Sequence, residues 1–95
     1  MEELLTKTKS LLSAKFPGSA DELAERLPGR RIGGAFVWSG FEGMAQIDRQ
    51  DLVREALNKG LTREEERLVG LLLTFTPHEV AMMEEYALEE HAVAA

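Results

Sequence analysis

The eleven residues Gly33–Gly43, GGAFVWSGFEG, hold four glycines and three of the chain's six aromatic residues. The overlapping segment from Ile32 to Ser39 is rich in aromatic and branched residues, which predicts a β-strand. Its paired glycines, 33 and 34, indicate a bulge or a close approach of two backbones. The sequence MAQIDRQDLVREAL, which follows, has a helical pattern. The glycine-rich end is therefore either a binding loop between strand and helix or a tight turn that folds Phe41 into a small core.

Amphipathic helices are predicted on both sides of this strand. Residues 2–16 have one apolar side, and the Pro-Gly pair after them ends the helix. That side consists of Leu4, Leu5, Leu11, Leu12 and Phe16. Residues 46–59 carry a second apolar stripe, and Gly60 is a natural stop. The second stripe consists of Leu52, Val53, Ala56 and Leu57.

Two further segments determine how many strands the sheet contains. Residues 19–29, SADELAERLPG, favour a helix by propensity, with Ser19 as a cap, yet Leu23, Glu25 and Leu27 alternate as on a half-buried strand. Residues 67–75, RLVGLLLTF, are too short and too uniformly apolar for a surface helix, so we expect a strand buried on both faces. The element order is then α-β-β-α-β-α, or α-α-β-α-β-α if residues 19–29 are helical.

Capping boxes predict two more helix starts. Thr62 with Glu65 predicts a single turn. The sequence TPHE at 76–79 predicts the final helix, because Thr76 can cap it, proline suits its first position and Glu79 completes the box. We expect this helix to bury Val80, Met83 and Ala87.

Composition indicates one α+β domain that spans residues 1–95, with its core over 3–88 and a frayed tail over 89–95. The chain has no cysteine, which excludes disulfides, thiolate ligands and cysteine nucleophiles. Residues 1–60 balance nine Lys/Arg against nine Asp/Glu, whereas residues 61–95 hold two against eight and account for the net charge of −6. This charge disfavours non-specific nucleic-acid binding. The acidic N-terminus and the lack of a long apolar run predict a cytoplasmic protein that is not associated with a membrane.

Metal and catalytic patterns are weak. The two histidines, His78 and His91, are thirteen residues apart, and metal ligands normally cluster. Ser39 lacks a G-x-S-x-G frame. Paired glutamates at 64–66 and 84–85 are explained as solvated helix faces. We therefore expect no enzymatic activity, no metal and no cofactor.

The segment from Phe41 to Leu57 resembles the signature of the BolA family, which runs Phe-x-Gly, a spacer, Arg-His-Arg, then Val and Leu at helical spacing. The matching positions are Phe41, Gly43, Arg49, Val53 and Leu57. TFTPHE is similar to the family's closing T-x-T-P-E-E, and the resemblance covers about residues 3–83. It implies a BolA-like fold related to the type II KH arrangement, with a three-stranded mixed sheet covered on one face by helices. It also implies that residues 20–27 form a strand.

The departures from that pattern concern function. BolA-like proteins are associated with monothiol glutaredoxins and shared iron–sulfur clusters, and some with transcriptional regulation. Their cluster ligand is the histidine between the two arginines, and this chain has Gln50 there and Asp51 in place of the second arginine. The family's histidine-bearing loop is replaced by a short LPGRR. A glutaredoxin-linked iron–sulfur adaptor is thus a disfavoured second alternative.

A nucleic-acid-binding module is the first alternative. Gly40 to Gly43 match the bare G-x-x-G of KH domains, although the middle positions are Phe41 and Glu42 rather than basic residues. The residues that would serve this function are Gly40, Gly43, Arg30, Arg31 and Arg49.

We favour a non-enzymatic protein-interaction or regulatory adaptor whose partner contacts Trp38, Phe41, Arg49 and Gln50. If helices cover the face of the strand that carries Phe36 and Trp38, these aromatics are core; if that face is open, they can anchor a partner.

Overall fold

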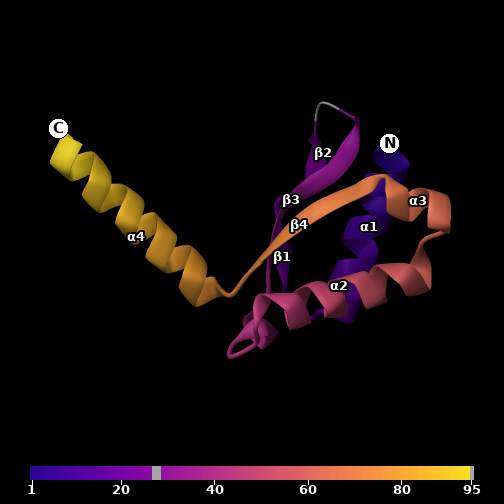
Figure 1. Cartoon of the computed structure of the whole chain (residues 1–95), viewed down its shortest axis with the longest axis horizontal. Helices are drawn as coiled ribbons and strands as arrows, with labels where there is room; N and C mark the ends of the chain where they lie inside the picture. The colour runs from indigo at the N-terminus through magenta and orange to yellow at the C-terminus, as the bar shows by residue number, and fades with distance from the viewer. Residues whose placement is uncertain (27–28, 95) are drawn as a thin grey trace.

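The structure is a computed structural model that describes residues 1–26 and 29–94, with side chains of the last helix described up to residue 87. Figure 1 shows the helices and strands in chain order. They are α1 (Glu2–Lys15), β1 (Ala20–Asp21), β2 (Ala24–Arg26), β3 (Arg31–Val37), η1 (Ser39–Phe41), α2 (Gln46–Gly60), α3 (Arg63–Arg67), β4 (Val69–Phe75) and α4 (Pro77–Ala94). The ambiguous segment is therefore extended, and the predicted α-β-β-α-β-α order is confirmed with the single turn α3 added.

The sheet is mixed and is organised around β3. Both β1 and β2 pair antiparallel with one edge of β3, so they act as one interrupted strand, and β4 pairs parallel with the other edge. The interruption lies opposite Gly34, whose φ of +138° favours glycine. A Cβ at this position would overlap the carbonyl oxygen of Glu22. The close backbone approach predicted for the paired glycines is thus confirmed.

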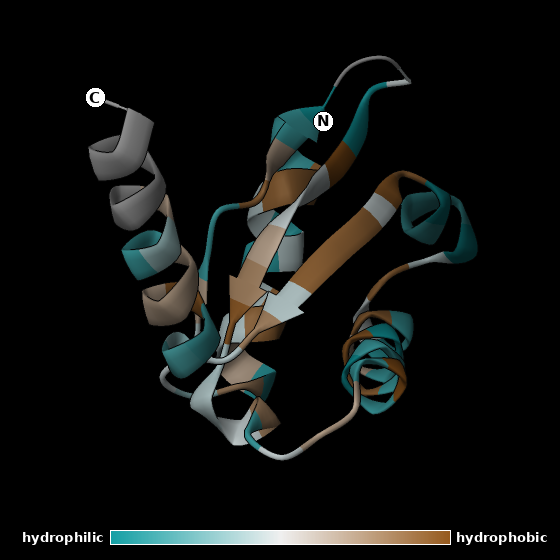
Figure 2. Cartoon of the chain, turned by 60° about the vertical axis from the view of Figure 1, so that its left-hand side comes forward, coloured by the Kyte–Doolittle hydropathy of each residue, from teal (hydrophilic) through white to brown (hydrophobic). Residues whose placement is uncertain are grey.

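Helices α1 and α2 cover one face of the sheet and enclose the core with it (Figure 2). Ile32 and Phe36 point into this core and are fully buried. Phe16, Phe36, Trp38 and Phe41 form a cluster of ring pairs whose centroids lie 4.9 to 6.0 Å apart. Edge-to-face pairs of this kind stabilise a core beyond the area that they bury. The face that carries Phe36 is therefore the covered one.

Two predictions about burial are wrong. β4 is not buried on both faces, because Leu71 and Leu73 on the face away from α1 and α2 are 70% and 48% exposed. Helix α4 does not bury Met83 and Ala87, which are exposed, and only Val80 is half-buried. The helix continues to Ala94; residue 95 of the predicted tail lies outside the described residues, and the fraying of 89–95 stays a prediction.

Helix α4 projects from the rest of the molecule (Figure 1). The radius of gyration is 14.8 Å, whereas a compact chain of this length would have about 12.4 Å. The projection explains why the apolar side of α4 stays exposed.

Candidate interaction site

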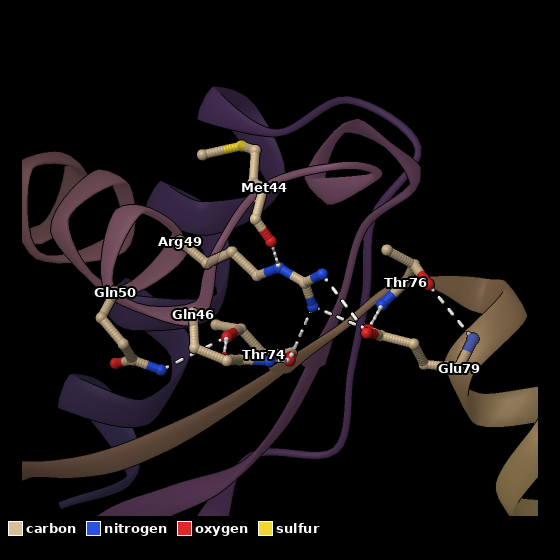
Figure 3. A network of polar contacts seen from close by, with 7 residues as sticks. All are labelled: Met44, Gln46, Arg49, Gln50, Thr74, Thr76 and Glu79. Carbon is tan, nitrogen blue, oxygen red and sulfur yellow. Dashed lines mark hydrogen bonds and ion pairs between the residues drawn. The ribbon is translucent and has the colours of Figure 1, made fainter.

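A buried arginine joins α2, β4 and α4 (Figure 3). Arg49 donates from Nε to Met44 O at 3.0 Å and from Nη1 to Thr74 O at 3.4 Å. Its two terminal nitrogens donate to the Glu79 carboxylate at 2.7 and 3.3 Å, a bidentate arrangement. The guanidinium also lies 5.8 Å from the ring centroid of Phe41. Through these contacts, Arg49 holds the start of α4 against α2 and β4.

The outer edge of β4 is covered by amide side chains of α2. Phe75 O accepts a hydrogen bond from Trp38 N, so the Phe75 carbonyl points toward β3. Successive carbonyls of a strand alternate in direction, so those of Leu72 and Thr74 point away from β3. Gln50 Nε2 donates to Leu72 O at 2.8 Å, and Gln46 Nε2 donates to Thr74 O at 3.0 Å. Helix α2 thus occupies two of the carbonyl acceptors that an added strand would use.

The Thr74 hydroxyl connects the same two glutamines. It donates to Gln46 Oε1 at 2.6 Å and accepts from Gln50 Nε2 at 3.3 Å. This explains a polar residue on the buried face of β4, since a buried hydroxyl needs a partner.

The predicted capping box at the start of α4 is confirmed. Glu79 N donates to Thr76 Oγ1 at 3.1 Å, and Thr76 N donates to Glu79 Oε1 at 2.7 Å. The pKa of Glu79 is lowered, first by the hydrogen bond from Arg49 and then by the one from the Thr76 backbone. The capping box at Thr62 and Glu65 is also confirmed. There the pKa of Glu65 is lowered by the Thr62 backbone and by Lys7.

The open face of the sheet and α4 form the walls of an apolar groove. Ala35 and Val37 of β3 and Phe75 of β4 line the sheet side, while Val80 and Met83 line the helix side. The groove has a volume of about 420 Å³. Figure 2 shows β4 in the brown of apolar residues, with α4 standing beside the sheet. Outside the groove, β4 and α4 carry four more exposed large apolar side chains, namely Leu71, Leu73, Met82 and Tyr86.

Two of the four residues expected to contact a partner lie at the strand-to-helix turn. Phe41 is fully buried. Trp38 is half-buried and donates from Nε1 to Pro17 O at 3.1 Å, with its ring directly over Gly40. Gly43 has a φ of +77°, which lets the chain reverse after Phe41. The glycines of GFEG thus serve the tight turn, and the role of all four residues in partner binding stays a prediction.

The residues of the nucleic-acid alternative do not come together. Gly40 and Gly43 lie at the α2 end of β3, whereas Arg30 and Arg31 lie at its start, a separation of about 20 Å for a seven-residue strand. Arg30 is paired with Glu25 at 2.8 Å. The fifth residue, Arg49, directs its guanidinium inward.

Sequence reasoning missed the glutamine contacts to β4 and the apolar groove. The signal for the groove was present in the apolar run of 68–75, but a run without alternation does not reveal which of its faces is covered. Within the described residues, no three His, Asp or Glu side chains are arranged to hold a metal ion. In the same part of the chain, no helix combines the length and apolar character that crossing a membrane requires.

Comparison with known proteins supports the fold. No family model matches the sequence, and no curated protein matches it significantly. Among solved structures, BolA1 from Arabidopsis thaliana is similar with a TM-score of 0.63 and 19% identity, over 83% of this chain and 98% of that one. A bol-like protein from Babesia bovis is similar with a TM-score of 0.63 and 19% identity, over 84% of this chain and 92% of that one. The chain therefore has the BolA-like fold that the signature segment implied.

Proposed function

We propose that this chain is a cytoplasmic protein-interaction or regulatory adaptor without enzymatic activity. The observation that carries the proposal is the apolar groove between the open face of the sheet and α4, together with the exposed large apolar side chains that β4 and α4 carry. Single exposed apolar side chains are common, whereas a contiguous set of large ones marks an interaction surface. Met83 lines the groove, and Leu71, Leu73 and Tyr86 are further exposed apolar side chains on the same two elements.

The partner would bind the face of the sheet rather than an edge. At one edge, α2 side chains hold the outward carbonyls of Leu72 and Thr74. At the other edge, β1 and β2 have only two and three residues and are interrupted. Short, interrupted or covered edges are how proteins prevent strand addition. The proposal therefore places the partner on the open face, where the groove beside α4 lies, and not in the smaller pocket of about 340 Å³ between α2 and β4.

The contact set expected from the sequence is revised in this proposal. Arg49 and Gln50 would not contact the partner but would position the elements that do, since Arg49 binds Glu79 at the start of α4 and Gln50 binds β4 from α2. Trp38 and Phe41 would stabilise the turn. Partner contacts would come from Leu71, Leu73 and the exposed side of α4.

An iron–sulfur role is not supported by these side chains. Gln50 has a neutral amide whose Nε2 donates a hydrogen bond to Leu72 O, and iron sites use thiolate, imidazole or carboxylate ligands. A nucleic-acid role is not supported by the residues assigned to it, because Arg30 and Arg31 lie at the opposite end of β3 from Gly40 and Gly43, and Arg49 is buried.

The test is affinity capture from nuclease-treated host lysate with three full-length baits. The wild type is compared with Leu71→Lys and with Ile47→Lys as a matched control on α2. Leu71 and Ile47 are 70% and 71% exposed, so both substitutions add one charge to an equally exposed apolar site. Circular dichroism confirms that each bait is folded.

The proposal predicts that Leu71→Lys loses specific protein partners that the wild type and Ile47→Lys retain. The proposal is refuted if all three baits capture the same proteins. It is also refuted if the wild type captures material from untreated lysate but not from nuclease-treated lysate.

A further inference from the structure

We infer that the groove between the sheet and α4 takes an amphipathic helix with lysine or arginine residues flanking its apolar stripe. This inference rests on the proposed adaptor function and names the chemistry of the partner. The groove volume of about 420 Å³ lies at the low end of the roughly 300–1,000 Å³ of small-ligand sites. It therefore has room for a few side chains that project from a partner, and the partner backbone stays outside.

The apolar walls fit anchors on one side of a helix. Val80 and Met83 are three residues apart on α4 and face the groove together, opposite Val37 and Phe75 of the sheet. A helix that is laid along such a groove inserts residues spaced at i, i+3 or i+4, and i+7. An extended peptide would need edge hydrogen bonds, and the α2 amides already hold the acceptors of β4.

The charges around the groove determine the flanking residues of the partner. Asp21, Glu22 and Glu84 line the groove together with its apolar walls. Lys9 lies 3.4 Å from Asp21, and within the described residues no ion pair joins Glu22 or Glu84 to a cation. Complementary charge at a rim favours association and suppresses wrong partners. Basic residues on either side of the apolar stripe would meet these carboxylates.

The same charges disfavour the α4 helix of a second copy of this chain as the occupant. Residues 77–94 contain five glutamates and no lysine or arginine. A second α4 laid into the groove would therefore bring like charges together.

The probes are two labelled helical peptides with identical apolar stripes, one with lysine and one with glutamate at all flanking positions. Each is titrated against the full chain by fluorescence anisotropy at low and at high salt. We expect saturable binding of the lysine peptide, which weakens with salt, and at least tenfold weaker binding of the glutamate peptide.

Neighbouring methionines on α4 supply the matched control. Met83 lines the groove and is 47% exposed, whereas Met82 does not line it and is 55% exposed. Both substitutions to lysine add the same charge to the same helix. Met83→Lys is expected to weaken binding about tenfold or more, since it removes a buried apolar contact. Met82→Lys is expected to change binding less than about threefold.

The inference is overturned if neither peptide binds, if the glutamate peptide binds as tightly, or if both methionine variants weaken binding equally. The adaptor proposal is tested separately by the Leu71-dependent capture of lysate proteins. If that capture succeeds while the lysine peptide fails, the partner chemistry is wrong and the adaptor function stands.

Discussion

Replacing Glu79 should cost more free energy of unfolding than replacing Arg49, although the two side chains form one ion pair. The Arg49 side chain is 6% exposed and that of Glu79 is 40% exposed. Glu79→Ala therefore leaves a buried cation without its anion, whereas Arg49→Met leaves a carboxylate that water can reach. Breaking a fully buried pair costs about 3–5 kcal/mol, and the partial exposure of Glu79 lowers this cost. Glu79→Ala also removes the capping bond to Thr76 N. We therefore expect Glu79→Ala to cost about 3 kcal/mol of the free energy of unfolding. Arg49→Met should cost about 2 kcal/mol, mainly from the carbonyls that it leaves.

The double variant separates this reasoning from simple loss of contacts. Once Glu79 is alanine, Arg49→Met removes an unpaired buried charge, so it should cost less than about 1 kcal/mol instead of about 2 kcal/mol. Urea unfolding measures each free energy, with Trp38, the chain's single tryptophan, as a fluorescent reporter of the core. Additive costs within about 0.5 kcal/mol would refute the account of a buried, coupled pair.

Three further predictions concern the pH dependence, the sheet and its bulge. The pKa of Glu79 is lowered in the folded state, so the stabilisation that this carboxylate contributes is present above its ordinary pKa of 4.5 and is lost as pH falls through the lowered value. The difference in urea midpoint between wild type and Glu79→Gln should therefore shrink below pH 4.5. A difference that stays constant with pH would contradict this. Leu72→Ala should lower the free energy of unfolding by about 2–5 kcal/mol, and Leu71→Ala by less than about 0.5 kcal/mol, because only Leu72 is buried. Similar losses in thermal unfolding would mean that both faces of β4 are covered. Gly34→Ala should cost about 2 kcal/mol or more, because its φ is positive and a Cβ would overlap Glu22; an unchanged melting temperature would exclude that strain.

Local patterns predicted the parts of the fold that depend on neighbouring residues. The capping box at Thr76 and Glu79 could be predicted from the sequence because its two hydrogen bonds link residues three positions apart. The α2 stripe could be predicted for the same reason: Val53, Ala56 and Leu57 are buried as expected, whereas Leu52 is exposed. Residues 20–27 were assigned to a strand only through the family resemblance, because their propensity favours a helix; of these, 20–21 and 24–26 are strands and 27 lies outside the described residues.

The parts that were missed depend on contacts between distant residues. Arg49 reads as one charge on a mixed-charge helix, and its partner Glu79 lies thirty residues further along the chain. The apolar pattern of α4 does not show whether the chain itself covers those side chains. Met83 was therefore expected in the core, and it lies instead on the wall of an open groove.

The most direct test of the interaction surface is methyl NMR of the full chain, with labelled leucine, isoleucine and methionine, during titration with the partner captured by the wild type. The account predicts that the methyl signals of Leu71, Leu73 and Met83 shift or broaden, while that of Ile47 on α2 does not change. Shifts confined to Ile47 and its neighbours on α2, with the signals of the open face unchanged, would contradict it.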